Sequence, residues 1–150
     1  YKPTHADRFV VKFADNLTSK LVTTRAYAAG EVIAPIEGVT YAAKRYTTVQ
    51  TGLNEHVELN SDLVYCNHSC DPSVIFDTDK MEVRAVRAMA EGDEMTFFYP
   101  ASEWDMDKPF DCWCGATQCV KKVQGAKYLT AEQLASFPLM SHIQQQVDAR

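Results

Sequence analysis

Several features that would place this sequence in a common class of protein are missing from it. It has no run of about 18 apolar residues, so no membrane-spanning helix is expected. The first residues, Tyr1 to His5, lack the apolar core of a signal peptide, which favours a cytosolic or nuclear protein. Basic residues are outnumbered, with 15 Lys and Arg against 20 Asp and Glu and a net charge of −5. Direct nucleic-acid binding, which needs clustered Lys and Arg, is therefore not expected.

Internal repeats, low-complexity tracts and an even set of cysteines are also absent. Five cysteines are a poor basis for a disulfide framework, and in a reducing compartment they favour metal ligation. The negative charge is compatible with a basic partner such as a lysine-rich peptide. With 150 residues, 46% of them apolar, the chain is long enough for one domain with a sizeable core.

Short β-branched and aromatic runs, separated by turn residues, fill the first two thirds of the chain. Asp15 and Asn16, for example, mark a turn between the first two runs. This spacing is typical of an all-β or β-rich α+β domain and leaves little room for parallel strand–helix–strand units. The expected strands are 8–13, 21–24, 31–34, 38–41, 46–50, 57–59, 74–76, 81–86 and 95–99.

The C-terminal residues have a different pattern. Thr130 to Gln133 resembles a capping box, which predicts a short helix beginning there. Pro138 ends that helix, and residues 141–147 predict another.

Three cysteines lie within eight residues, at Cys112, Cys114 and Cys119. Zinc takes four tetrahedral ligands, and thiolates form closed structural sites. Gly115 lets the backbone fold tightly enough for the three thiols to face one ion. A packing role for these thiols is the alternative, and an open catalytic zinc is disfavoured. The fourth ligand has to come from elsewhere, and the competitors are Cys66, Cys70, His5, His56, His68 and His142.

A second polar segment, Tyr65 to Pro72, contains the run Asn67-His68-Ser69-Cys70. On its own it is compatible with a polar loop that ends in a turn, or with a ligand site. A Cys–His nucleophilic pair is the third reading, but adjacency in sequence supplies no oriented base.

Together these segments resemble the SET domain followed by a post-SET zinc motif. The resemblance rests on 67–72, then on Glu94-Met95-Thr96-Phe97-Phe98-Tyr99, then on the cysteine array, in that order, and covers about residues 8–120. It implies small curved β-sheets with a pseudoknot-like loop. It also implies transfer of a methyl group from S-adenosylmethionine, most often to a protein lysine.

The same resemblance assigns roles to individual residues. Asn67 and His68 would contact S-adenosylmethionine, largely through backbone and amide groups. Tyr99 would be the catalytic tyrosine at the methyl-transfer pore and would also border the cofactor. Phe97 would line that pore, and Trp113 would cover the adenine.

Two further expectations follow from the resemblance. Cys70 would complete a structural zinc site with the three cysteines of the array, one ion per chain. The chain would divide into a SET domain at 8–108, a post-SET zinc segment at 109–122 and a helical tail at 123–150.

The sequence departs from the family at its first cofactor-binding turn. A Gly-x-Gly is usual there, but the position holds Thr18-Ser19-Lys20, followed by Leu21. Lys20 and Leu21 are retained as cofactor-binding positions, and Thr18 and Lys20 are expected to narrow the pocket because glycine allows closer backbone approach.

The expected function is thus an S-adenosylmethionine-dependent methyltransferase acting on a lysine-containing protein or peptide, with histones as one candidate. A small-molecule acceptor and a non-catalytic SET-like binding module are the alternatives. Tyr99 as a plain core aromatic and Trp113 as a packing residue are the alternatives for the individual sites. Phe97 and Phe98 alternate, so one is expected to face the core and the other a pocket or solvent.

Overall fold

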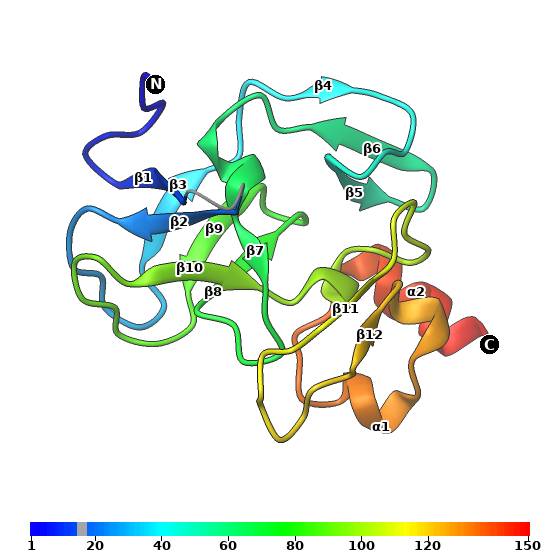
Figure 1. The fold of residues 1–150 in the computed structure, drawn as a ribbon. Helices are drawn as coiled ribbons and strands as arrows, with labels where there is room; N and C mark the ends of the chain where they lie inside the picture. The colour runs from blue at the N-terminus through cyan, green and yellow to red at the C-terminus, as the bar shows by residue number, and fades with distance from the viewer. Residues whose placement is uncertain (15–17) are drawn as a thin grey trace.

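The computed structural model describes residues 1–14 and 18–150 and has the expected β-rich architecture, with small sheets and few short helices (Figure 1). The predicted turn at Asp15 and Asn16 lies outside the described residues. Among the described residues, no helix is long and apolar enough to cross a membrane.

The central sheet contains strands from both ends of the SET-like region. Strand β2 lies between β1 and β10, and β10 in turn pairs in parallel with the two-residue strand β7. This parallel pairing places the Asn67–His68 segment next to Thr96 and Phe97. The bounds are Phe9–Phe13 for β1, Ser19–Thr23 for β2, Asn67–His68 for β7 and Glu94–Phe97 for β10.

Two three-stranded sheets flank this centre, in the orders β3-β9-β8 and β4-β6-β5. Alternation in β9 buries Val83 and Ala85 on one face, as its period-two sequence predicts. A 3-10 helix η1, Asp62–Tyr65, leads into β7. The bounds are Val32–Pro35 for β3, Thr40–Tyr41 for β4, Thr48–Gly52 for β5, Glu55–Glu58 for β6, Val74–Asp77 for β8 and Glu82–Ala85 for β9.

The aromatic strand expected at 95–99 ends early, at Phe97. A 3-10 helix η2, Tyr99–Ala101, begins directly after Phe98, because Pro100 has no N–H to donate to a sheet. Phe97 and Phe98 lie in different cores, in line with the expected alternation, and neither faces solvent, since both side chains are buried. Phe97 belongs to the core of the sheets, whereas Phe98 stacks on Phe137 at 3.6 Å between ring centroids in a second core.

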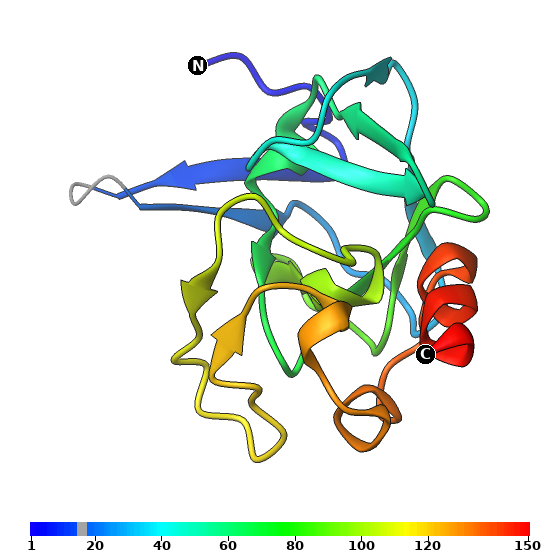
Figure 2. The ribbon, with the colours of Figure 1, turned by 90° about the vertical axis from the view of Figure 1, so that its right-hand side faces the viewer.

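This second core unites the cysteine array with the C-terminal residues, which gather at one end of the molecule (Figures 1 and 2). The predicted capping box of Thr130 and Gln133 is present at the start of α1, and α2 begins at Ser141 as predicted. The bounds are Phe110–Asp111 for β11, Lys122–Val123 for β12, Ala126–Tyr128 for the 3-10 helix η3, Ala131–Leu134 for α1 and Ser141–Ala149 for α2.

Gly125 lies where this tail packs against the loop that follows η2. Its replacement by alanine is expected to destabilise the fold. Its φ is +116°, and a Cβ would lie 2.2 Å from the carbonyl oxygen of Trp104. Backbone strain and steric overlap together predict a loss of about 3 kcal/mol in the free energy of unfolding. Urea denaturation measures it. Gly92→Ala is the matched control, because Gly92 also has a positive φ but no atom within 4 Å of the added Cβ; an equal loss in both variants would contradict the clash.

Candidate functional site

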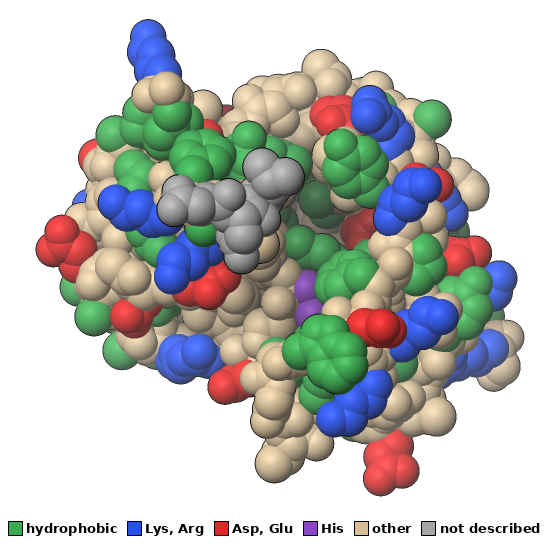
Figure 3. All heavy atoms as spheres, in the orientation of Figure 1, with side chains coloured by type: hydrophobic (Ala, Val, Ile, Leu, Met, Phe, Trp, Pro, Cys, Tyr) green, Lys and Arg blue, Asp and Glu red, His purple; other side chains and the backbone are tan. Residues whose placement is uncertain are grey.

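A cavity of about 600 Å³ opens between the β4-β6-β5 sheet, the η1–β7 segment and the chain that follows β10. The space-filling view shows a hollow on this face, bordered by apolar side chains and a histidine (Figure 3). Its lining combines residues that are far apart in the sequence, which include Ser19, Val49, Leu63, Asn67, Phe97, Tyr99, Glu103 and Phe110.

Tyr99 is held in this cavity at both ends. Its backbone N–H donates to Nδ1 of His68 at 3.1 Å, and its hydroxyl donates to the carbonyl oxygen of Cys66 at 2.8 Å. Burial raises the pKa of Tyr99, and the nearby Cys66 and Glu103 add to the shift. The phenol therefore stays protonated at neutral pH, and its hydroxyl is a fixed hydrogen-bond donor.

Phe97 lies between two other rings in the wall of the same cavity. Its ring stacks on that of Phe76 at 4.1 Å and is tilted against that of Tyr99 at 4.5 Å. Aromatic pairs at these separations add to the stability gained from burial. The two rings predicted for the pore, Phe97 and Tyr99, are thus in contact and fixed by packing.

Asn67 connects the cavity to the strand at which the cofactor-binding turn is expected. Its side-chain amide donates to the carbonyl oxygen of Ser19 at 2.8 Å, and both residues line the cavity. Of the two neighbours predicted to bind the cofactor, Lys20 is exposed and Leu21 is fully buried in the core. Neither is among the residues that line the cavity, so only Ser19 represents this turn there.

Trp113 is 88% exposed and does not line the cavity. The packing role considered for it from the sequence is therefore wrong. Its prediction as an adenine-covering residue stays a prediction.

His68 joins the cavity to the cysteine cluster. Burial lowers the pKa of His68 to about 4, so the imidazole is neutral at neutral pH. Since Nδ1 accepts from Tyr99, the single ring proton lies on Nε2, which is 3.3 Å from the sulfur of Cys70. The His68 side chain is thereby used in protein contacts, and the expected cofactor contact can come only from its backbone.

The four cysteines predicted to hold zinc lie together. The sulfur atoms of Cys70, Cys112, Cys114 and Cys119 are all within 4.8 Å of one another, and the first two are 3.9 Å apart. Tetrahedral zinc with bonds of about 2.3 Å requires sulfur atoms about 3.8 Å apart. The set therefore fits one tetrahedral ion. Burial raises the pKa of Cys70, so binding a metal there has to displace a proton.

Glu103 is a residue of the cavity that the sequence did not single out. Its carboxylate accepts from the backbone N–H of Gln50 at 2.8 Å and from the hydroxyl of Ser102 at 3.0 Å. Burial raises its pKa to about 7, although both hydrogen bonds and the charge of Lys44 act in the opposite direction. The only signal in the sequence is an acidic residue four positions after Tyr99, which alone predicts nothing.

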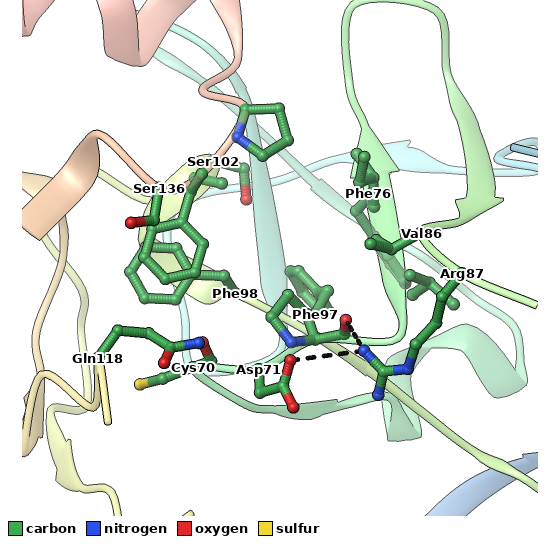
Figure 4. Close-up of a pocket in the computed structure, with 16 residues that line it drawn as sticks. Cys70, Asp71, Phe76, Val86, Arg87, Phe97, Phe98, Ser102, Gln118 and Ser136 are labelled. Atoms are coloured by element: carbon green, nitrogen blue, oxygen red, sulfur yellow. Dashed lines mark hydrogen bonds and ion pairs between the residues drawn. The ribbon is translucent and has the colours of Figure 1, made fainter. Parts of the chain in front are cut away.

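A second, smaller cavity of about 200 Å³ lies on the other side of Phe97, between β8, Phe98 and Phe137 (Figure 4). At its edge, Arg87 donates to the carbonyl oxygen of Pro72 at 2.9 Å and pairs with Asp71 at 3.5 Å. Most of its lining is apolar, and Cys70, Asp71 and Arg87 are the titratable residues among those that line it.

Comparisons with known proteins agree with this architecture. A family model described as the SET domain matches residues 5–100. Methyltransferase flvH of Aspergillus flavus is 42% identical over 95% of this chain and 82% of its own length. A histone-lysine N-methyltransferase, H3 lysine-36 specific, of Chaetomium globosum is 36% identical, but over 41% of this chain and 7% of that protein.

Histone-lysine N-methyltransferase mes-4 of Caenorhabditis elegans is 30% identical over 61% of this chain and 10% of its own length. The crystal structure of KRYPTONITE in complex with mCHG DNA and SAH has a similar fold, with a TM-score of 0.56 and 18% identity over 77% of this chain and 29% of that chain. This chain therefore spans most of the Aspergillus flavus relative and only a small part of the histone enzymes.

Proposed function

This chain belongs to the SET-domain family, and we propose that it transfers a methyl group from S-adenosylmethionine to the amine of a protein lysine. The observation that carries the proposal is that Asn67, from one motif, and Phe97 and Tyr99, from a second motif about 30 residues later, line one cavity. The name of the Aspergillus flavus relative, which aligns with nearly the whole chain, supports methyl transfer.

The chain's own groups suit an in-line displacement at a methyl carbon. S-adenosylmethionine supplies an electrophilic methyl group, so the acceptor nitrogen has to be neutral, aligned and desolvated. The carbonyl oxygen of Cys66 and the hydroxyl of Tyr99 orient that nitrogen, and the rings of Phe97 and Tyr99 exclude water from it. Aromatic faces also attract the cationic groups on either side of the reaction.

The cofactor would lie against Asn67 and the backbone of His68, with the backbone of Lys20 and Leu21, beside Ser19, at the edge of the site and Trp113 as its cover. Cys70, Cys112, Cys114 and Cys119 would hold one structural zinc ion, whose four thiolates leave no open position for a substrate. The ion would therefore stabilise the post-SET segment rather than take part in methyl transfer.

The acceptor class rests on the relatives. Histone-lysine N-methyltransferases among them support a lysine in a basic protein, a nuclear location and a histone tail as the first substrate to test. A small-molecule amine is the second candidate acceptor. The relative that aligns with almost the whole chain is named only as a methyltransferase, and its name specifies no substrate. This chain spans 82% of that relative.

Titration calorimetry with S-adenosylhomocysteine tests the proposal at its first step. Saturable binding at one site per chain is expected, followed by methylation of a histone H3 peptide or of a small amine when S-adenosylmethionine is supplied. A folded protein that binds neither form of the cofactor would leave only the non-catalytic binding module.

Asn67→Ala is expected to weaken S-adenosylhomocysteine binding about tenfold, because a hydrogen bond from the amide to a charged group of the ligand contributes about 1.5 kcal/mol. The hydrogen bond to Ser19 would be lost as well. Calorimetry of the variant gives the affinity directly. Asn54→Ala, in the exposed turn between β5 and β6, is the matched control and should bind like the parent protein; an unchanged affinity in Asn67→Ala would remove Asn67 from the site.

A further inference from the structure

We infer that Glu103 is a catalytic residue of this site: its carboxylate binds the ammonium group of the acceptor and removes the proton that has to leave before methyl transfer. The inference rests on the proposed function for the reaction, and it adds a cationic amine as the class of acceptor. It assigns a role to a cavity residue that lies outside the motifs of the sequence.

The position of Glu103 places it in the same space as the catalytic tyrosine. It lines the cavity that contains Tyr99, and its backbone N–H donates to the carbonyl oxygen of Tyr99 at 3.0 Å. Tyr99 begins η2, and Glu103 lies in the turn that directly follows it. Both side chains face the same hollow from the segment that separates the two cores.

The carboxylate is fixed through one oxygen only. The N–H of Gln50 and the hydroxyl of Ser102 both donate to Oε2, while among the described residues nothing donates to Oε1. The side-chain oxygen of Gln50 in turn accepts from the N–H of Trp104 at 2.9 Å, which locks β5 against the Glu103 segment. Oε1 is left to accept a proton from a group inside the cavity, in a geometry set by the protein.

Among the residues that the structure describes, no Lys or Arg pairs with this carboxylate. Lys44, the basic residue that lowers its pKa, donates instead to the carbonyl oxygen of Asp105 at 2.8 Å. Within the described residues, Glu103 forms no ion pair with Lys or Arg. A half-buried carboxylate without a cationic partner is expected to attract one. The other titratable groups that line the cavity are Lys44, Arg45, Tyr46, Tyr65, Cys66, Tyr99, Asp107 and Lys108.

The proton affinity of Glu103 suits this task. Burial brings its pKa to about 7, close to the range in which general bases work best at neutral pH. Above that pH the carboxylate is charged and can bind the ammonium; below it the carboxyl is neutral and binds less well. The hydroxyl of Tyr99 cannot serve as the base, because burial raises its pKa and it stays protonated.

The step balances as a proton transfer followed by a displacement. The ammonium N–H bond breaks and the proton passes to the carboxylate, which becomes a carboxylic acid and leaves a lone pair on nitrogen. That lone pair forms the new C–N bond while the methyl–sulfur bond breaks and its electron pair goes to sulfur. The product is a methylated ammonium, and Glu103 returns its proton to water at the cavity opening.

A purely structural role is the competing explanation, since Glu103 also satisfies Gln50 and Ser102. The two explanations differ in their dependence on the charge of the ligand and on pH. A structural defect would weaken charged and uncharged ligands alike and would lower activity equally at every pH. Loss of the base would affect the cationic ligand alone and would be relieved at high pH.

The first measurement is the binding of n-butylammonium, which mimics the end of a lysine side chain. NMR shifts of backbone amides around the cavity report this binding. Glu103→Gln is expected to weaken this binding about tenfold, as loss of a hydrogen bond to a charged group predicts, and to leave the weaker binding of n-butanol unchanged. Glu132→Gln, an exposed glutamate in α1, is the matched control. Thermal melting checks that each variant is folded.

The second measurement is the pH profile of kcat/KM for methylation. In the parent protein kcat/KM should rise through about pH 7. In Glu103→Gln it should be about 100-fold lower at neutral pH and approach the parent value near the amine pKa of about 10.4. Glu103→Asp, which keeps a carboxylate, should retain part of the activity and an inflection near neutral pH.

The outcomes separate the two hypotheses. Active parent protein with an unchanged pH profile in Glu103→Gln overturns the role of Glu103 and leaves methyl transfer standing. Inactive parent protein whose n-butylammonium binding still depends on Glu103 overturns methyl transfer and supports the cation site. Absence of n-butylammonium binding in the parent protein overturns the cation site.

Discussion

Tyr99→Phe is expected to lower kcat about 10²- to 10³-fold, the usual effect of removing one preorganised hydrogen-bonding group from an active site. Affinity for S-adenosylhomocysteine should change less than about threefold, because the ring remains and a single hydrogen bond contributes about 1 kcal/mol. The hydroxyl lost in this variant donates to the carbonyl oxygen of Cys66 at 2.8 Å. Without it, that carbonyl and the acceptor nitrogen are no longer held in one fixed arrangement.

The measurement is a single-turnover methylation assay alongside calorimetry of the same preparation. Tyr128→Phe is the matched control, because it removes the same hydroxyl from an exposed tyrosine whose partner is Asp105, outside the set of cavity residues. It should keep full activity. If Tyr99→Phe keeps more than about one third of the turnover, its hydroxyl has no role in the transition state.

The contrast between Tyr99 and Glu103 shows what the sequence could and could not predict about this site. Tyr99 was found because it stands at a fixed offset in a short motif, and a motif preserves the local geometry that chemistry requires. Glu103 depends on Gln50, 53 positions away. That contact exists only because the β4-β6-β5 sheet packs against the segment after β10, and such long-range packing has no local signature.

The two cores show the same limit at the level of the fold. Nine of the strands, in their order, follow from period-two alternation and turn residues, and the capping box located α1 correctly. The two-residue strands β7, β11 and β12 were not predicted, because two residues are too few to show a period. The boundary at Phe98 does not follow from alternation. It is set by Pro100 and by the stack with Phe137, a residue 39 positions later. Periodicity within a strand cannot indicate that the chain leaves one core for another.

Trp113 and Leu21 illustrate a third limit, which concerns side-chain orientation. Trp113 lies between two cysteines of the cluster yet is 88% exposed, because the array turns its thiols toward a common centre and its intervening side chain outward. Leu21 lies two residues after Ser19 in β2, yet its side chain is fully buried in the core and does not line the cavity. A resemblance by position transfers a residue's place in the chain, not the direction of its side chain.

Removal of the metal is expected to have the largest effect on the fold, because binding energy at a structural zinc site is folding energy, about 10–16 kcal/mol in small zinc modules. We expect about one zinc ion per chain in freshly purified, reduced protein. Chelation or Cys70→Ser should abolish zinc binding and should expose residues 109–150 to amide hydrogen exchange. Cys66→Ser is the matched control, since Cys66 is equally buried but lies outside the four-cysteine cluster.

The position of Cys70 extends this prediction from the tail to the active site. Its sulfur lies against Nε2 of His68, and Nδ1 of the same ring accepts from the backbone N–H of Tyr99. The His68 ring therefore links the metal ligand Cys70 directly to Tyr99. Metal loss should therefore lower the rate of methyl transfer in addition to disordering the C-terminal tail, even though no thiolate contacts the acceptor amine. Outer contacts of metal ligands typically change affinity or activity about 10- to 100-fold. A metal-free preparation with an ordered tail and full turnover would contradict both the predicted disorder of the tail and the predicted loss of activity. In that case the packing of the second core, through Phe98 and Phe137, would be sufficient to hold residues 109–150 and Tyr99 in place.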